Sequence, residues 1–322
     1  MSNAQPPTQA GGSPSVETVP AAAKAKEMSA ADSGQVGGRT ARGRRSAEKP
    51  VKVSRAGRNL PAAIAVGVIL LGSLLSGLLF FPFAIVIIAV GFAAVGVWEV
   101  NRALEVRGMK VPQVPVLVGS VALPFAAFFG GTEALAFAMV ATSVAILLWR
   151  SIDTAAEAIQ SILAGIFVVL WVPFLLSFAL LLLREPDGQV RVAVLLLLVV
   201  SNDTFGYLVG AFFGKHPMAP KISPKKSWEG FGGSAVGAAV VGVGAAVLFL
   251  DQPWWFGVVL AVATVAAATA GDFSESMVKR ELGVKDMSNL LPGHGGVMDR
   301  LDSVVFASPV VFLLSVLLST AS

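Results

Sequence analysis

From Leu60 onward the chain alternates long apolar segments with short polar ones. Each apolar segment is roughly 18–25 residues long, enough for a helix to cross a hydrocarbon layer about 30 Å thick. We expect nine such spans, at 60–79, 82–101, 113–130, 132–149, 161–183, 190–212, 231–250, 254–274 and 303–320. The joins at Pro82 and at Gly130–Gly131 are very short, so eight spans are also consistent with the pattern. The pattern predicts an all-α, polytopic integral membrane protein with about nine transmembrane helices.

Residues 1–58, before the first apolar segment, have a different composition. They are rich in Ala, Gly, Ser, Pro, Thr and Gln and contain almost no large apolar residues. Such a segment cannot bury enough apolar surface to fold alone, so we predict a disordered N-terminal tail, followed by a transmembrane domain over 59–322. The end of the tail, 39–58, is strongly basic, which suits contact with anionic lipid headgroups.

The composition of the whole chain agrees with a membrane protein. Of its 322 residues, 55% are hydrophobic and 14% are charged, whereas about a quarter of residues are charged in soluble domains. Ten of the 24 Lys and Arg residues lie before residue 60, and the others flank apolar segments. This distribution is typical of membrane topology, so we expect no nucleic-acid partner. The absence of cysteine excludes disulfides and thiolate metal sites.

The positive charges also predict the orientation of the spans. If the tail is cytoplasmic and the spans alternate, 22 of the 24 Lys and Arg residues lie on the cytoplasmic side, and only Arg184 and Arg191 lie outside. This bias follows the positive-inside rule. It places the N-terminus and both long polar loops, 213–230 and 275–302, on the cytoplasmic face, where nucleotides are available. We therefore expect an active site that faces the cytoplasm.

The loop at 275–302 contains the densest group of chemically active residues. Counting from Asp272, the residues at intervals of three and four share one helical face: Asp272, Glu275, Ser276, Lys279 and Arg280. A helix that continues past the eighth span would present these carboxylates and cations as one stripe, although a solvated helix end would give the same pattern. Lys279, Arg280 and Arg300 are suited to bind anionic oxygens.

A glycine-rich turn at 292–296 follows the stripe, and its backbone can approach a ligand closely. Asp299 lies after this turn. We favour it as a metal ligand together with Asp272, because Mg²⁺ needs only one or two carboxylates besides substrate phosphates. Asp302 lies one helical turn after Asp299. It could belong to the same site, but capping the helix N-terminus explains it equally well. His294 could act as a general base, donate to a phosphate, or hydrogen-bond within the turn.

The loop at 213–230 is basic and rich in proline. Lys221, Lys225 and Lys226 provide more cations than a topology signal needs, and Ser223 adds a hydroxyl donor. The prolines stiffen the loop, which lowers the entropic cost of holding the lysines around a polyphosphate. No Walker A motif is present. An ordinary cytoplasmic basic loop is the alternative explanation.

Asp203 lies within the predicted span at 190–212, where a carboxylate is costly unless it faces the helix bundle or water. Gly206, Gly210 and Gly214 lie on nearly the same side and allow close helix packing, so we expect Asp203 to point inward. The sequence leaves open whether Asp203 binds a metal, positions a lysine or ties helices together.

The chain resembles the phosphatidate cytidylyltransferases, also called CDP-diacylglycerol synthases. Their signature begins with Ser, any residue, an aliphatic residue and Lys-Arg, continues with four residues and Lys-Asp, and ends in Leu-Pro-x-His-Gly-Gly-aliphatic-x-Asp-Arg-x-Asp. Residues 276–302 match it at every specified position. The segments 202–207, 213–216 and 222–230 are also similar to family patterns. The resemblance is strong over about 200–302 and does not include the tail.

The resemblance implies an enzyme of a bacterial-type inner membrane that forms CDP-diacylglycerol and pyrophosphate from CTP and phosphatidate. It also implies a homodimer, dependence on Mg²⁺, sometimes with a second, monovalent cation such as K⁺, and a metal centre at Asp272 and Asp299. Residues 59–190 then supply the N-terminal spans and 191–322 the catalytic spans and loops. Because the phosphate of phosphatidate is already anionic, a strong general base is not needed. We assign triphosphate binding to Lys221, Lys225 and Lys226, headgroup binding to Lys279 and Arg280, and further substrate contacts to Ser223, Asp203, His294 and Arg300.

Two other functions fit parts of the sequence. A CTP-dependent polyprenol kinase would transfer the γ-phosphate to an alcohol and release CDP. An ion-coupled transporter would explain a carboxylate within a span and the glycine-rich helices, but not the dense cationic loops. A CDP-alcohol phosphotransferase would need the motif Asp-x-x-Asp-Gly-x-x-Ala-Arg, which is absent.

Overall fold

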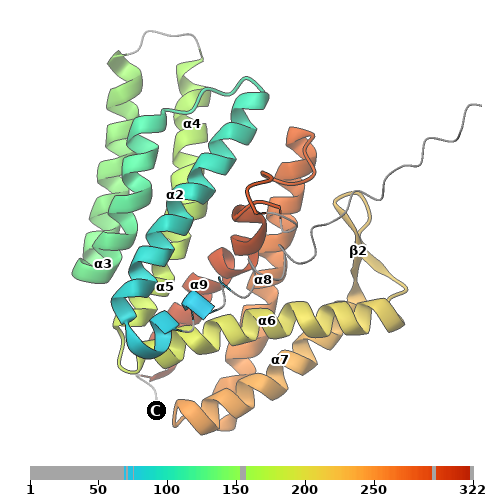
Figure 1. Ribbon diagram of the computed structural model, residues 1–322. Helices are drawn as coiled ribbons and strands as arrows, with labels where there is room; N and C mark the ends of the chain where they lie inside the picture. Colours follow the sequence, from blue (N-terminus) through green and yellow to red (C-terminus); the bar gives the residue numbers. More distant parts are fainter. Residues whose placement is uncertain (1–68, 70–71, 75, 153–156, 292–294, 320–322) are drawn as a thin grey trace, which may run out of the picture. The chain divides into compact units, whose positions relative to one another are not determined.

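The computed structural model describes residues 69, 72–74, 76–152, 157–291 and 295–319 (Figure 1). Its elements are α2 (Pro82–Val106), α3 (Gln113–Ile152), α4 (Ala158–Val169), the π-helix η1 (Leu170–Phe174), α5 (Leu175–Arg184), α6 (Gly188–Phe213), β1 (Pro217–Ala219), β2 (Ser223–Ser227), α7 (Trp228–Phe249), α8 (Trp254–Leu282) and α9 (Met298–Ser319). Within the described ranges, seven helices are long and apolar enough to cross a membrane. The prediction of a polytopic all-α membrane protein is confirmed.

The predicted count of nine spans is not confirmed. The tail at 1–58 and most of the first predicted span, 60–79, lie outside the described residues. Helix α3 covers two predicted spans: it is 40 residues long, but Gly131 has non-helical dihedral angles, with φ 77° and ψ −160°. Its two arms fold back on each other (Figure 1), since a Cβ atom at Gly119 would lie 2.5 Å from Cγ2 of Thr142. The short join that the sequence shows is therefore a tight turn.

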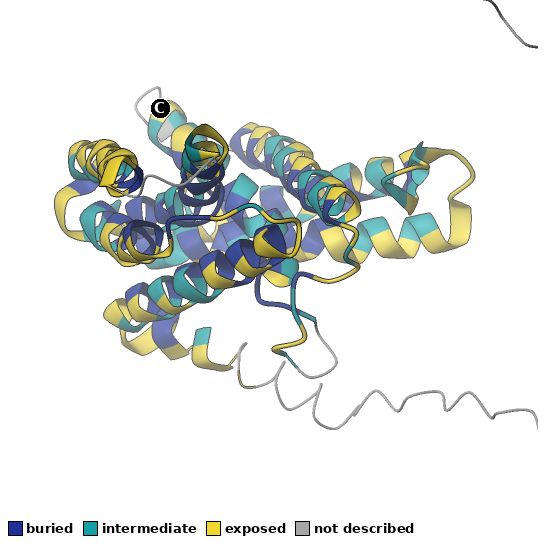
Figure 2. Ribbon diagram, turned by 90° about the horizontal axis from the view of Figure 1, so that it is seen from above, coloured by how far each residue is buried: buried dark blue, intermediate teal, exposed yellow. Residues whose placement is uncertain are grey.

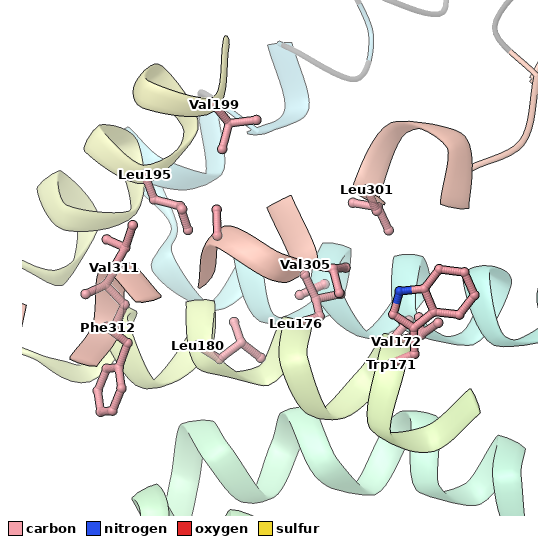
Figure 3. Close-up of a cluster of buried hydrophobic side chains, with 14 of the residues drawn as sticks. Trp171, Val172, Leu176, Leu180, Leu195, Val199, Leu301, Val305, Val311 and Phe312 are labelled. Carbon is pink, nitrogen blue, oxygen red and sulfur yellow. The ribbon is translucent and has the colours of Figure 1, made fainter. Parts of the chain in front are cut away.

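Helices α4, η1 and α5 form one continuous apolar segment through the centre of the bundle. Pro173 has no N–H to donate, and the helix widens to a π-turn around it. Leu176 and Leu180 of α5 pack against Leu195 of α6 and Val305 of α9 in a buried cluster (Figure 3). This packing connects the central segment to α9, and thereby to the polar loop that precedes it.

Opposite ends of the helices bring distant parts of the chain together. At one end, Nε of Arg107, just after α2, donates to the carbonyl of Leu282 at the end of α8 (3.1 Å). At the other end, the Arg184 guanidinium of α5 lies against Gly131 at the turn of α3. The exposed side chains lie mainly on the outer faces of the helices (Figure 2) and include many large apolar residues, as expected for helices in contact with lipid.

Helices α6 and α7 lie side by side, as do α8 and α9 (Figure 1). The glycines of α6 allow the first of these contacts: a Cβ atom at Gly206 would lie 2.5 Å from Oγ of Ser234, and one at Gly230 would lie 2.9 Å from the Gly206 carbonyl. The close packing predicted from the glycine spacing is observed. In α8, Gly271 allows an equally close approach to α9.

The loop at 213–230 is partly ordered as a β-hairpin, which the sequence reasoning did not predict. Strands β1 and β2 pair in an antiparallel arrangement, with Pro217 opposite Ser227. Both strands are edges of a two-stranded sheet, so a proline that cannot donate is tolerated. Glu229 of α7 stabilises the start of the hairpin, because its carboxylate accepts from the backbone N–H groups of Lys215 (3.1 Å) and His216 (3.2 Å).

Candidate active site

The polar stripe is part of α8. The helix continues past its apolar portion to Leu282, and Gly283 ends it in a left-handed conformation with φ 71°. Glycine adopts this conformation without strain, which explains a stop at this residue. Asp272, Glu275 and Lys279 then lie on the face of α8 that contacts the start of α9, as the predicted helix spacing requires.

The first cluster of the site surrounds Asp299, in the first turn of α9. Its Oδ1 accepts from Nζ of Lys279 (2.8 Å), and its Oδ2 accepts from the N–H groups of Gly296 (2.7 Å) and Met287 (3.1 Å). The same Lys279 donates to Oε2 of the buried Glu275 (2.6 Å). Lys279 therefore bridges two carboxylates, and its side chain is only 15% exposed.

The second cluster surrounds Asp272. Its Oδ2 forms an ion pair with Nζ of Lys226 from β2, and its Oδ1 accepts from Oγ of Ser303 (3.1 Å) in α9. Asp302 also lies against Asp272. The pair between Lys226 and Asp272 brings the basic hairpin to the polar stripe and so joins the two loops that the sequence analysis assigned to one site.

The acidic residues of the two clusters, Asp272, Glu275, Asp299 and Asp302, fit a hard cation by their chemistry, because they offer carboxylate oxygens. Glu275 interacts with both Asp299 and Asp302, and its Oε1 is buried without a hydrogen-bond partner. Within the described ranges, no three acidic or histidine side chains converge in the arrangement that holds a metal ion. A site for Mg²⁺ would therefore rest on one or two carboxylates, with substrate oxygens as the other ligands.

A cavity of about 240 Å³ opens beside the second cluster, between α6, β2, α7 and α8. Its lining carries both charges of the pair between Lys226 and Asp272 and includes two aromatic rings. Its principal lining residues are Asn202, Asp203, Lys225, Lys226, Asp272, Tyr207 and Phe231. Within it, Nδ2 of Asn202 donates to Oδ1 of Asp203 (3.0 Å).

Other predicted site residues do not line this cavity. Lys221 and Ser223 belong to the hairpin but do not line the cavity, and Lys221 is exposed. Arg280 is directed to the same hairpin, where its Nε donates to the Ile222 carbonyl (3.4 Å). Arg300 is exposed and acts electrostatically on Asp203. His294 lies outside the described residues.

The sequence reasoning missed two residues that hold the site together. Ser303 was not singled out, and nothing in the local sequence distinguishes it from other helix serines. Glu99 of α2 is fully buried and accepts from the N–H groups of Val297 (2.9 Å) and Met298 (2.8 Å). A carboxylate inside an apolar span is a signal that could have identified Glu99.

Comparison with known proteins identifies the family of this chain. Residues 61–318 match the Cytidylyltransferase family. A protein of Mycobacterium leprae named phosphatidate cytidylyltransferase is 40% identical over 280 residues, which cover 82% of this chain and 90% of that protein. One of the same name from Mycobacterium bovis is 37% identical over 281 residues, covering 83% and 92%. One from Haemophilus influenzae is 46% identical over 122 residues, covering 35% and 41%. The chain therefore belongs to the cytidylyltransferase family.

Proposed function

We propose that this protein is a phosphatidate cytidylyltransferase, which transfers CMP from CTP to phosphatidate and releases pyrophosphate. The observation that carries the proposal is the ion pair between Lys226 and Asp272, which joins a basic hairpin to a carboxylate cluster at one end of a membrane helix bundle. The hairpin lysines can bind the phosphates of a nucleotide, and the carboxylates can bind a hard metal ion. The position at one end of the bundle gives access to a lipid phosphate near the membrane surface. The names of the relatives favour this reaction over the polyprenol kinase and the transporter.

The cavity beside Asp272 suits the nucleotide. Lys225 and Lys226 supply positive charge in its lining, where the triphosphate would bind. Tyr207 and Phe231 supply aromatic surface on which a cytosine ring can stack, and the side chains of Asn202 and Asp203 can hydrogen-bond to its polar edge. The headgroup of phosphatidate would approach from the side of Arg280, which is exposed beside the hairpin.

The reaction depends more on aligning phosphatidate with the α-phosphorus of CTP than on proton transfer. An anionic oxygen of phosphatidate attacks the α-phosphorus of CTP and forms a new P–O bond, while the bond from that phosphorus to the bridging oxygen of the β-phosphate breaks. Lys225 and Lys226 reduce the repulsion between the two anions and stabilise the departing pyrophosphate. Mg²⁺ held by Asp272 and Asp299 would neutralise charge on the phosphate oxygens. Lys279 and Ser303 hold those two carboxylates in place.

One assay tests the reaction. Purified protein in detergent is given CTP labelled at the α-phosphate, phosphatidate and Mg²⁺. We expect labelled CDP-diacylglycerol together with unlabelled pyrophosphate in equal amounts, and we expect the product to disappear with EDTA and return with added Mg²⁺. Release of CDP with a phosphorylated alcohol would support a kinase instead. Turnover that is unchanged by EDTA would refute the metal assignment.

We further propose that the site faces the cytoplasm and that the protein is a homodimer. The sidedness rests on the distribution of positive charge, and the dimer rests on the family resemblance. Because the chain has no cysteine, single cysteines can be introduced cleanly at the exposed residues Glu281 and Asp187. A membrane-impermeant maleimide applied to intact cells should label the variant Asp187→Cys and spare Glu281→Cys. Light scattering of purified protein should give the mass of two chains, and the mass of one chain would refute the dimer.

A further inference from the structure

Glu99 is a buried carboxylate that connects α2 to the start of α9. It is 0% exposed, and the residues that it contacts are 189 to 199 positions away in the chain. Its Oε1 accepts from the N–H of Val297 (2.9 Å) and from Oγ of Ser288, and its Oε2 accepts from the N–H of Met298 (2.8 Å). A carboxylate at this depth needs several donors to offset its lost hydration, and these three contacts supply them.

The two backbone donors lie at the N-terminus of α9, where Met298 is the first residue of the helix and Val297 is the residue before it. The N–H groups at the start of an α-helix have no partner within the helix, and a negative charge placed there is favourable. Glu99 therefore caps α9 from another helix, while Asp299 caps the preceding N–H, that of Gly296, from within α9. Successive N–H groups of one turn are divided between a carboxylate of α2 and a carboxylate of the proposed metal site.

Gly296 shows how closely the two carboxylates enclose this turn. A Cβ atom at Gly296 would lie 2.8 Å from Oε2 of Glu99, 2.9 Å from its Oε1, and 3.0 Å from Oδ2 of Asp299. A side chain at this position would have to displace one carboxylate or the other. The position of this turn is therefore confined between the Glu99 carboxylate and the Asp299 carboxylate.

We propose that Glu99 is a positioning residue of the reaction: it fixes the first turn of α9, and thereby sets where the Asp299 carboxylate stands relative to Lys279 and Asp272. Glu99 does not touch the cavity that we assign to the nucleotide. Its role is to prevent the turn that carries Asp299 from shifting. This inference rests on the proposed function, which assigns Asp299 to the metal site.

The test compares wild-type protein with Glu99→Gln and with the control Glu105→Gln, an exposed residue on the same helix. Glutamine has the shape of glutamate but offers only one acceptor oxygen, so one of the two N–H groups meets an amide NH₂. Hydrogen exchange is measured on peptides that cover 296–302, and it needs no turnover. We expect these amides to exchange roughly 10-fold faster in Glu99→Gln and at the wild-type rate in Glu105→Gln.

Steady-state kinetics per folded molecule provides the second measurement, with the folded fraction taken from size-exclusion chromatography. We expect kcat to fall roughly 10-fold or more in Glu99→Gln, with KM for CTP changed less than about threefold, because the hairpin is untouched. A purely structural role would lower the folded fraction but leave kcat and exchange of the remaining protein unchanged, and that result would overturn the proposal.

A milder variant keeps the proposal testable if Glu99→Gln does not fold. Ser288→Ala removes one contact of Glu99 and leaves both backbone contacts. We expect it to lower kcat about threefold and to accelerate exchange at 296–302. Wild-type values for both would overturn the proposal. A wild-type protein that forms no CDP-diacylglycerol would refute the proposed function instead, and the exchange measurement would still decide whether Glu99 holds this turn.

Discussion

Substituting Gly271 by alanine should separate α8 from α9 at the proposed site. A Cβ atom at Gly271 would lie 2.4 Å from the carbonyl oxygen of Asp302 and 3.1 Å from Cβ of Phe306. Ordinary contacts begin near 3.4 Å, so the two helices must move apart by about 1 Å at this point. The obstacle is backbone, which cannot rotate away as a flexible side chain can. The contact between Asp272 and Ser303 lies directly beside the crossing.

The effect on the reaction should exceed the effect on stability. Overpacking of this kind costs about 1–3 kcal/mol, and alanine returns about 0.5–1 kcal/mol of that as the better helix former. A displacement of about 1 Å at a group that aligns reactants can lower the rate by about 100-fold. We therefore expect Gly271→Ala to fold, to lose about 1–2 kcal/mol of stability, and to lose between about 10-fold and 100-fold in kcat.

The assay is formation of labelled CDP-diacylglycerol by purified protein, corrected for the folded fraction after size-exclusion chromatography. The matched control is Gly244→Ala in α7, where an added Cβ atom meets nothing within 4 Å. We expect this variant to keep the wild-type rate. If Gly271→Ala kept its kcat within about twofold of wild type, the distance between α8 and α9 at Asp272 would not matter for the reaction, and the reasoning would be refuted.

Three further variants test other parts of the site. Asp299→Asn should abolish Mg²⁺-dependent turnover in folded protein, and near-normal turnover would remove Asp299 from the metal site. Replacing Lys225 and Lys226 together by alanine should raise KM for CTP at least about 10-fold and affect KM for phosphatidate less, since about 1.4 kcal/mol corresponds to tenfold; an effect confined to the lipid would reverse our assignment. Glu229→Gln should weaken the hairpin by removing the charged acceptor of two backbone N–H groups. It should raise KM for CTP severalfold with kcat unchanged, whereas an unchanged KM would show that the hairpin does not need this contact.

The membrane architecture could be predicted because hydrophobic length is a local property of the sequence. The boundaries of α6 and α7 fall within a few residues of the predicted spans at 190–212 and 231–250. The turn at Gly131 was predictable for the same reason, since two glycines interrupt an apolar stretch that is too long for one crossing. The hairpin could not be predicted, because each of its strands carries a proline, Pro217 and Pro224, and proline argues against a strand unless the strand is an edge.

The polar stripe could also be predicted, because residues at intervals of three and four share a helical face whatever the tertiary structure. The residues that contact this stripe could not be predicted. Lys226 reaches Asp272 across 46 positions of sequence, and the lysine loop offered three lysines without indicating which one makes the contact. Lys279 was expected to meet a lipid headgroup, and the sequence did not indicate that it also contacts Asp299 and Glu275. A lysine between two buried carboxylates must satisfy them before it can serve a substrate.

The signature at 276–302 lies within one stretch of chain, yet the geometry it produces depends on helices outside it. The first turn of α9 is held on one side by α8, through Lys279 and Asp299, and on the other by Glu99 of α2. Neither contact alone would fix the turn, because a helix end held at a single point can still rotate about that point. Two contacts from different helices remove this freedom and leave Asp299 in one position. On the positioning role that we propose for Glu99, the alignment of the reacting groups depends on α2 as well as on the signature.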